Sequence, residues 1–298
     1  MITLYLNRHE QDDRRRELIF GGDFFLHTDL ASSKALCQHA KDMVLEAFDG
    51  LDPERAQFEL ELPDFIKRVG PLKSGFTNSA KTKDLCKALV EELGCDPDQT
   101  YYDLPRLRVV PSDNYLSSGV SYAYKAHRDT WYAHPTQLVN YWIPVFPVVG
   151  QNTMSMFVGY FDKPVQNASN QFDYDDWVAN QRFSASSHVK KDERPHPVPQ
   201  APIDTHSEIR IAGGMGDVMM FSTCHLHATA PNNSGVTRFS VDLRTINLRD
   251  VKSGVGPANV DSYATGTTLG DFLRGSDHAP LDVSEVPDAA RKKAPALA

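Results

Sequence analysis

Short apolar segments, separated by turn-forming residues, dominate the chain from residue 101 to about residue 247. These segments are rich in β-branched and aromatic residues, and Pro, Gly, Ser and Asn divide them. They read LRVV, VSYAYKAH, LVNYWIPVF, MSMFVGYF, EIRIAGG, DVMMFSTCHLHATA and VTRFSVDLRTI. Runs of this kind are typical of antiparallel strands. The sequence therefore predicts a β sandwich or barrel in this region.

The first hundred residues have a different, mostly helical pattern. An amphipathic stretch runs from Ser32 to Phe48, with Ser33 as the expected N-cap. A second stretch, from Thr82 to Leu93, carries leucines at helical spacing and stops at Gly94. We expect a mainly β protein with N-terminal helices.

Residues 162–206 interrupt the strand pattern. This segment is polar, contains several prolines, and is too long for an ordinary connection, so a lid, a binding loop or an insertion is expected. The last residues, 288–298, are expected to form a loose tail. We expect one domain over residues 1–298, with a helical part (1–100), a β core (101–247, including the insertion 162–206) and a C-terminal extension (248–298).

The charge of the chain limits its partners. The formal net charge is −8, which argues against nucleic acid or an anionic membrane surface as the main partner. No apolar run approaches the roughly 20 residues that span a bilayer, and the N-terminal residues do not resemble a secretory signal. We expect a cytoplasmic protein that acts without nucleic acid or membrane. The four cysteines form no C-x-x-C pair, so buried, reduced thiols are expected.

A His-x-Asp tripeptide, His127-Arg128-Asp129, ends one of the predicted strands. In a strand, residues i and i+2 project from the same face, so the imidazole and the carboxylate can meet at one metal ion while Arg128 points elsewhere. Two histidines and one carboxylate on one face of an octahedron leave three positions open, as in non-haem Fe(II) oxygenases.

A second segment, residues 216–244, supplies candidates for the third ligand. It contains His225 and His227, a turn at residues 231–235, and a returning strand with Arg238. Both histidines lie on the same strand face, so the pattern alone leaves either as the ligand. If the two strands form a hairpin that closes about residues 232–233, His227 faces Arg238 and both side chains enter one cavity.

Arg238 indicates an anionic ligand in that cavity. A buried cation is costly unless an anion pairs with it. The distal carboxylate of 2-oxoglutarate can accept a bidentate pair of hydrogen bonds from the guanidinium group. Thr229, two residues after His227, can add a hydroxyl donor from the same face.

Taken together, these residues resemble the phytanoyl-CoA dioxygenase-like branch of the Fe(II)/2-oxoglutarate-dependent oxygenases. The resemblance covers roughly residues 100–247. It is carried by HRDTWY at 127–132, NYWIPV at 140–145, and GD at 216–217 followed by HAT, NNS and the arginine at 227–238. In that family the iron-binding histidine lies ten positions after the aspartate of the GD pair and eleven before the arginine. His227 has this spacing from Asp217 and Arg238, so the resemblance selects His227 over His225.

The resemblance implies a role for each matching residue. His127, Asp129 and His227 would bind the iron, Arg238 and Thr229 would bind the far carboxylate of 2-oxoglutarate, and Trp142 would lie near this co-substrate. Halogenating relatives lack the carboxylate ligand, so the presence of Asp129 favours an oxygenase outcome.

The same resemblance implies a fold and a reaction. The fold would be a double-stranded β-helix, the jelly roll of the cupins. The reaction would consume Fe(II)-bound 2-oxoglutarate and O2, release succinate and CO2, and hydroxylate or otherwise oxidise a small-molecule substrate. One segment departs from the family: MSMFVGYFDKP stands where a P-G-S-H-like segment is usual. The substrate side is therefore expected to be specialised.

Several other residues have two interpretations. Trp131, Tyr132 and His134 either line the pocket or pack in the core. Arg106 and Arg108 are expected at a solvated strand edge rather than in the cavity. The aromatic residues of the insertion, interleaved with aspartates, would suit a lid over a polar or cationic substrate; these are Phe172, Tyr174 and Trp177.

Two other protein classes compete with the oxygenase. A cupin-like metal-binding protein or isomerase would use the same barrel without oxygenase activity, but it would not need Arg238. A β-sandwich interaction module would bind no metal.

Overall fold

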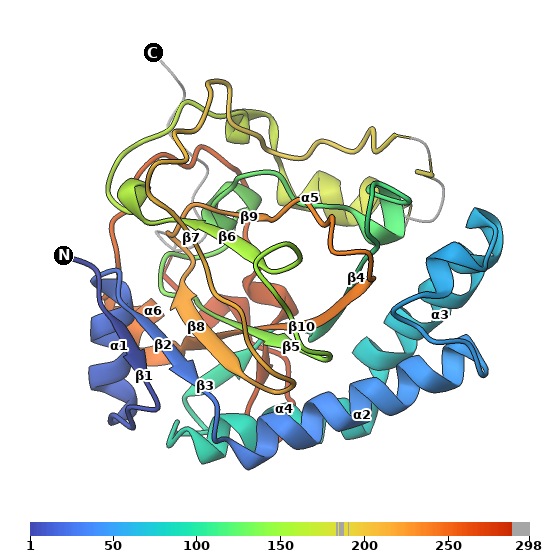
Figure 1. Cartoon of the computed structure of the whole chain (residues 1–298). Helices are drawn as coiled ribbons and strands as arrows, with labels where there is room; N and C mark the ends of the chain where they lie inside the picture. The colour runs from blue at the N-terminus through green and yellow to red at the C-terminus, as the bar shows by residue number, and fades with distance from the viewer. Residues whose placement is uncertain (183, 185–187, 190, 288–298) are drawn as a thin grey trace.

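Helices occupy most of the first hundred residues, and strands dominate the rest of the chain (Figure 1). The structure is a computed structural model and describes residues 1–182, 184, 188–189 and 191–287. The expected tail at residues 288–298 lies outside the described residues. Within the described part of the chain, no helix is both long enough and apolar enough to cross a bilayer.

The N-terminal segment is not purely helical, because two of its strands join the main sheet. β1 (Leu4–Leu6) pairs in parallel with β2 (Phe24–His27), and α1 (Asp12–Phe20) connects them. β2 in turn pairs antiparallel with β8 (Val218–Ser222). The sequence pattern did not predict these strands, since each is only three or four residues long.

Three longer helices follow: α2 (Ala31–Phe48), α3 (Leu62–Asn78) and α4 (Ala80–Glu92). The predicted helices are therefore confirmed, but the predicted N-cap is wrong. α2 begins before Ser33, and the Ser33 hydroxyl instead donates to the carbonyls of Leu30 (3.0 Å) and Gly216 (2.7 Å). The side chain thereby joins α2 to the turn before β8.

The main sheet has eight strands in the order β1-β2-β8-β5-β10-β3-β11, with β4 also paired to β10. A second sheet has the order β7-β6-β9. The other strands of the two sheets are β3 (Thr100–Tyr102), β4 (Arg106–Val110), β5 (Val139–Pro144), β6 (Met154–Phe157), β7 (Glu208–Arg210), β9 (His227–Thr229), β10 (Arg238–Asn247) and β11 (Leu273–Arg274). The sheet-rich structure with N-terminal helices agrees with the predicted class.

The remaining elements are short. They are the helix α6 (Leu248–Ser253), the α-helical turn α5 (Tyr174–Asp176), the π-helical turn η6 (Trp177–Gln181) and the 3₁₀ turns η1 (Ala56–Phe58), η2 (Gly119–Ser121), η3 (Asp129–Tyr132), η4 (Val158–Tyr160), η5 (Ser169–Gln171), η8 (Leu269–Asp271) and η9 (Val283–Glu285).

The two faces of the main sheet have different surroundings. On β10, Phe239, Val241 and Leu243 belong to the hydrophobic core that the sheet shares with α2, α3 and α4. The helices cover this face (Figure 1). The alternate residues of β10, among them Arg238 and Arg244, point to the opposite face and line a cavity.

The second sheet covers that opposite face. Phe24, Trp142, Met219 and Phe221 of the main sheet share a buried cluster with Met154 and Met156 of β6. Side chains from two facing sheets therefore fill the space between them.

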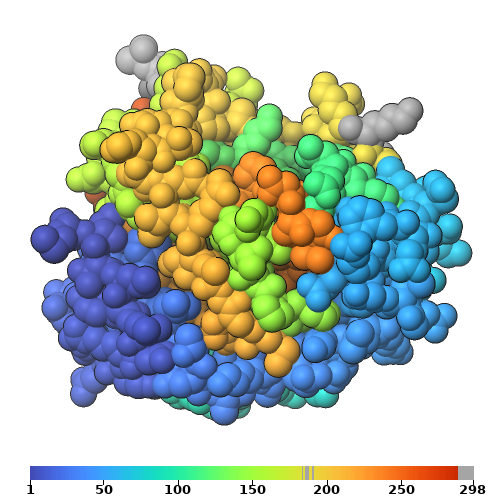
Figure 2. All heavy atoms as spheres, viewed as in Figure 1, coloured from blue at the N-terminus to red at the C-terminus, as the bar shows by residue number. Residues whose placement is uncertain are grey.

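The expected hairpin between β9 and β10 is wrong. β9 pairs with β6, whereas β10 pairs with β4 and β5, so the two strands lie in different sheets. The Asn232 side chain fixes this crossing by donating to the carbonyls of Val110 (2.9 Å) and Val236 (2.8 Å). The segment that crosses between the sheets, residues 230–237, is orange in Figure 2 and lies beside the green turn near residue 150. The Asn152 side-chain amide donates to the Ser234 hydroxyl there (3.2 Å).

The predicted strand at residues 120–127 is also wrong. Residues 119–121 form the turn η2, and the backbone here bonds to the 162–206 insertion. The Ser118 hydroxyl donates to the Val189 carbonyl (2.7 Å), and the Gly119 amide donates to the Asp192 carboxylate (3.1 Å). Only the end of the segment pairs with β9, where Tyr124 accepts from Thr229 (2.9 Å) and His127 forms a bridge with His227.

The four cysteines are free and buried, as predicted: Cys37, Cys86, Cys95 and Cys224. Burial raises the pKa of Cys37 to about 12 and that of Cys224 to about 12. These two thiols are therefore protonated and unreactive at neutral pH.

Arg128 points away from the cavity, as the tripeptide predicted, into a buried polar cluster. Its guanidinium group binds both oxygens of Asp261 (3.1 Å each) and donates to the carbonyls of Tyr160, Lys163 and Cys224. Asp261 also accepts from the Trp131 indole (2.6 Å). This cluster joins the tripeptide to the start of the insertion and to the C-terminal extension.

We predict that Arg128→Met lowers the free energy of unfolding by about 3–5 kcal/mol, because it leaves the buried Asp261 charge unpaired. Urea unfolding followed by circular dichroism would measure this loss. Lys252→Met is the control, since it removes an ion pair whose side chains are 42% and 53% exposed, and it should barely move the midpoint. Equal losses in the two variants would contradict the prediction.

Candidate functional site

Three side chains that the sequence singled out meet in the cavity. His127, Asp129 and His227 are all buried, and one possible ligand atom of each lies within 4.8 Å of the others. The His127 Nε2 atom is 3.8 Å from Asp129 Oδ1. The imidazole rings of His127 and His227 are 4.4 Å apart between centroids.

The local backbone differs from the expected strand but brings the tripeptide side chains together. His127 forms a β-bridge with His227, with both amide-to-carbonyl bonds at 2.9 Å. Asp129 is the first residue of the turn η3, and its amide donates to the Thr223 carbonyl (3.2 Å). The bridge and the turn thus replace the i, i+2 geometry of a continuous strand.

Hydrogen bonds to backbone carbonyls set the tautomer of both histidines. His127 Nδ1 lies 2.8 Å from the Lys125 carbonyl, and His227 Nδ1 lies 2.9 Å from the His225 carbonyl. A carbonyl only accepts, so each Nδ1 carries a hydrogen, and Nε2 is the ring atom left to bind a metal. Burial and the neighbouring His227 lower the pKa of His127 to about 3, so this ring is neutral at neutral pH.

The Asp129 carboxylate is held by two donors on neighbouring strands. Asn140 Nδ2 donates to Oδ2 (2.7 Å), and the Arg244 guanidinium donates to Oδ1 (3.3 Å). Burial alone would raise the pKa of Asp129, but the charge of Arg244 and the nearby histidines lower it well below its usual value. Asp129 is therefore ionised, and its orientation is fixed.

His225 lies apart from this cluster. Its Nε2 atom is 2.9 Å from the Gly22 carbonyl. Its ring lies 4.3 Å from that of Phe24 and 4.6 Å from that of Phe161, measured between centroids. The structure thus brings His227, not His225, to His127 and Asp129.

Arg238 lies in the same cavity, although β9 and β10 do not pair. One of its terminal nitrogens donates to the carbonyls of Asn152 (3.2 Å) and Thr153 (2.9 Å). In the part of the chain that the structure describes, its buried Nε atom has no hydrogen-bond partner, and its guanidinium carbon is 5.7 Å from the centre of the Trp142 ring. Burial lowers the pKa of Arg238 to about 10, so the group stays charged at neutral pH.

No carboxylate of the described residues is hydrogen-bonded to Arg238. Thr229, on β9, also lines the cavity. The full lining comprises Arg108, Val110, Tyr122, Tyr124, His127, Asn140, Tyr141, Trp142, Met154, Phe221, His227, Ala228, Thr229, Arg238, Asp242 and Arg244. The cavity thus holds metal-type donors together with a buried cation that can pair with a carboxylate.

The expectation for Arg108 is wrong, because its side chain lines the cavity and does not lie at a solvated strand edge. It donates to Asp242 (2.5 Å) and to the Tyr124 hydroxyl (3.4 Å). Arg106 is half-buried and donates to Asp103 (2.7 Å) outside the cavity lining. β4 pairs with β10, so Arg108 lies opposite Ser240 and reaches Asp242.

Sequence reasoning missed Asn140, Asp242 and Arg244. For Asp242 and Arg244, the sequence pattern does contain a signal. Residues 242 and 244 share a strand face with Arg238 by the alternation of β10. Asn140 gave no such signal, because its contact with Asp129 depends on how β5 approaches the turn η3.

Trp131, Tyr132 and His134, which follow the tripeptide, have different surroundings. Trp131 is fully buried in a core cluster, and the His134 ring bonds to the Thr268 hydroxyl (2.9 Å). Tyr132 lies close to the metal-type donors, with its ring 5.3 Å from that of His127. Its hydroxyl is 3.2 Å from His196 Nδ1.

The insertion packs against this aromatic side of the site. The His196 ring stacks on Tyr122 at 3.8 Å between centroids, and Trp177 lies 5.2 Å from His196. Phe172 lies 5.2 Å from Tyr132. Tyr174 instead bonds to Asp271 of the C-terminal extension, so it does not share the position of the other two aromatic residues.

No protein-family model and no curated protein matches the sequence. Among solved structures, the chain is similar to apo ThoJ, a non-heme monooxygenase (13% identity, 84% of this chain and 78% of that chain, TM-score 0.42). It is also similar to EvdO2 from Micromonospora carbonacea var. aurantiaca, complexed with 2-oxoglutarate (14%, 80% and 91%, TM-score 0.46). A third is EctD from S. alaskensis with 2-oxoglutarate and 5-hydroxyectoine (14%, 79% and 76%, TM-score 0.39). These TM-scores are below 0.5, so the function proposed next rests on residues of this chain.

We predict that Asn140→Leu weakens binding of Mn(II) at the His127 site by about 10–100-fold, because Asp129 loses the donor that orients it. Titration of the metal-free protein with Mn(II) would measure the change. Asn180→Leu is the matched control, since Asn180 also donates to an aspartate at 2.7 Å, but on the surface. An unchanged affinity in Asn140→Leu would contradict the prediction.

Proposed function

We propose that the protein is a non-haem Fe(II)- and 2-oxoglutarate-dependent oxygenase that hydroxylates or otherwise oxidises a small molecule. One observation carries the proposal. A buried His-Asp-His set, whose Nδ1 atoms both donate to backbone carbonyls, adjoins the cavity that holds Arg238, a buried cation without a carboxylate partner among the described residues. Burying the Arg238 cation without an anion is costly, and the cation together with the metal-type donors fits a metal-bound dicarboxylate.

The donor set fits Fe(II). His127, Asp129 and His227 would hold the ion through two imidazole nitrogens and one carboxylate, which leaves positions for a bidentate co-substrate and O2. Bound iron would supply the activation of O2, coupled to oxidation of 2-oxoglutarate to succinate and CO2. The carboxylate at position 129 would occupy the site that a halide would need, which favours an oxygenase outcome over halogenation.

The chain itself would orient the co-substrate. Arg238 would pair with the far carboxylate of 2-oxoglutarate, using the nitrogens that the carbonyls of Asn152 and Thr153 leave free. Thr229 would add a hydroxyl donor, and Trp142 would pack beside the guanidinium group. The apolar side chains of Met154 and Phe221 line the same cavity and would keep water from this ion pair, which strengthens it.

The primary substrate would lie against the aromatic side of the cavity. Tyr122 and Tyr124 line this side, and the Tyr124 ring is 5.2 Å from the His127 ring. The 162–206 insertion packs against the same residues through His196. From this position, the insertion would be the main determinant of which substrate the protein accepts.

We also propose that the two facing sheets form a double-stranded β-helix within one domain over residues 1–298. The shared core cluster between the sheets supports this assignment. So does the crossing of the chain from β9 in one sheet to β10 in the other.

We predict that 2-oxoglutarate raises the melting temperature of the protein in the presence of Mn(II), because a ligand that binds only the folded state stabilises it. Arg238→Met should weaken 2-oxoglutarate binding by at least about 100-fold, and Arg238→Lys should recover part of it, since Lys keeps the charge but not the bidentate geometry. Thermal shift titrations measure both effects.

Arg249→Met is the control for that experiment, because the Arg249 side chain is 73% exposed. It should bind 2-oxoglutarate as the wild type does. No thermal shift in the wild type, or a full shift in Arg238→Met, would contradict the proposed co-substrate site.

We further predict that His227→Ala loses bound iron and abolishes 2-oxoglutarate-dependent succinate release, because it removes one of three ligands. His225→Asn should keep its iron, since the His225 ring bonds to the Gly22 carbonyl and not to the cluster. Iron content and succinate release, measured on anaerobically reconstituted protein, separate the two variants. The reverse pattern would mean that His225 is the ligand.

A further inference from the structure

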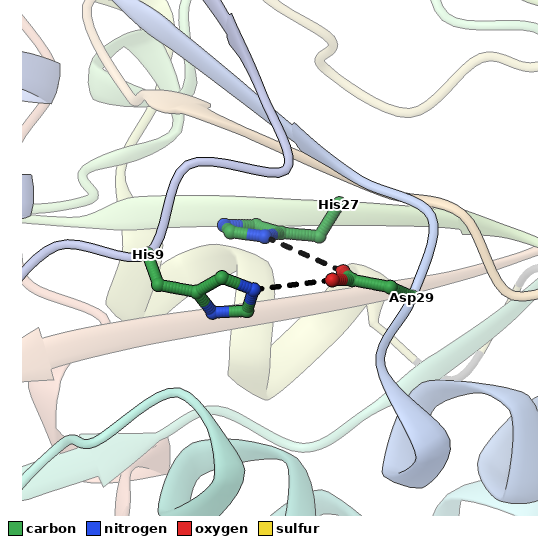
Figure 3. Close-up of side chains that lie close together, drawn as sticks. All are labelled: His9, His27 and Asp29. Atoms are coloured by element: carbon green, nitrogen blue, oxygen red, sulfur yellow. Dashed lines mark hydrogen bonds and ion pairs between the residues drawn. The ribbon is translucent and has the colours of Figure 1, made fainter.

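A second His-x-Asp tripeptide, His27-Thr28-Asp29, lies at the end of β2. Its two outer residues meet His9, which follows β1 (Figure 3). His9 Nε2 is 3.1 Å from Asp29 Oδ2, and His27 Nδ1 is 3.9 Å from Asp29 Oδ1. One possible ligand atom from each of the three residues lies within 4.8 Å of the others. Both rings in Figure 3 turn a nitrogen toward the carboxylate.

His27 is the unusual member of this group. Its side chain is 1% exposed, and neither ring nitrogen has a hydrogen-bond partner among the described residues. A buried polar group without a partner is costly, and an ion is one of the few explanations for it. Burial, with a smaller effect of Arg15, lowers the pKa of His27 to about 4.

The spacing of these atoms suits a small divalent cation. In a tetrahedral zinc site the metal–ligand bonds are about 2.0–2.2 Å, so two ligand atoms lie about 3.3 Å apart. The two contacts to Asp29, 3.1 Å from His9 to Oδ2 and 3.9 Å from His27 to Oδ1, involve both carboxylate oxygens and lie on either side of that separation. The His127–Asp129 separation at the first site is similar, at 3.8 Å.

The backbone near His9 is held against the end of β2. The Asn7 amide donates to the Leu26 carbonyl (2.9 Å), and the Asn7 side chain exchanges hydrogen bonds with Thr28. The nearby cations are already paired, Arg8 with Glu10 and Arg15 with Asp12. Their charges are therefore partly neutralised.

This group is separate from the first site. Along β2, Phe24 faces the cavity side of the sheet and Phe25 faces the helices. His27 follows Phe25 by two residues and stacks on it with an interplanar angle of 14°. It therefore lies on the opposite sheet face from the cavity.

We propose that His9, His27 and Asp29 form a second metal site, which binds Zn²⁺ with water as the fourth ligand. Two imidazole nitrogens and one carboxylate are a common zinc donor set. The ion would join the segment after β1 to the end of β2. It would thereby close the loop that contains α1 and fix it to the edge of the main sheet. The site does not depend on the oxygenase function.

Zinc content of the full-length protein tests this proposal. Each variant is incubated with Zn²⁺, passed through a desalting column, and measured by elemental analysis. Wild-type protein should hold about two ions per chain, and His9→Ala and the double variant His127→Ala/Asp129→Ala about one each. The triple variant that combines these changes should hold almost none. His9 is chosen because its side chain is 62% exposed, so its removal should not disturb folding.

A thermal measurement gives an independent result. Zn²⁺ should raise the melting temperature of His127→Ala/Asp129→Ala by several degrees, and adding His9→Ala should remove the increase. His206→Ala, which changes an exposed histidine elsewhere, is the matched control. The proposal is wrong if His9→Ala holds as much zinc as the wild type, if the double variant holds none, or if His206→Ala loses as much as His9→Ala. If the wild type holds one ion and His9→Ala holds none, the site at His127 does not bind zinc, and that result would bear only on the oxygenase proposal.

Discussion

The alternation of side chains along β10 is the constraint on which the rest of the structure depends. One face of this strand contributes Phe239, Val241 and Leu243 to the core beneath the helices. The other face places Arg238, Asp242 and Arg244 in the cavity. A shift of one residue in its pairing with β5 would exchange the two sets and bury charges in the core. The hydrophobic core and the polar site therefore fix the same register.

The buried charges of the cavity are stable because nearly all are paired. Arg244 binds Asp103 (3.0 Å) and Asp129 (3.3 Å), and Arg108 binds Asp242 (2.5 Å). Arg238 is the exception, since its polar partners are backbone carbonyls. A folded protein can contain such a cation when an anionic ligand pairs with it. Arg238, more than the metal-type donors, therefore supports the proposed dicarboxylate co-substrate.

The sequence predicted the members of the site better than the path of the chain between them. His127 and Asp129 could be placed together because they are two positions apart in the sequence, and Arg238 was identified by its spacing of eleven residues from His227 in the family resemblance. The hairpin prediction failed because the turn at residues 231–235 has the same local signal whether the chain returns in one sheet or crosses to another. Contacts of Asn232 with Val110 and Val236, the first of them distant in sequence, decide the outcome. The role of Asn140 depends on the same kind of distant packing, and no local pattern contains it.

The buried cluster around Arg128 has a consequence for how such a chain can diversify. The tripeptide is held through Arg128, which bonds to Asp261, Tyr160 and Lys163 on the side away from the cavity. The aromatic contacts of the insertion lie further along the chain, between Phe172 and His196. Under the proposed function, replacements in that outer stretch would change the wall beside the metal without removing the contacts that hold Arg128. The residues that would set the substrate are thus separate from those that fix the tripeptide.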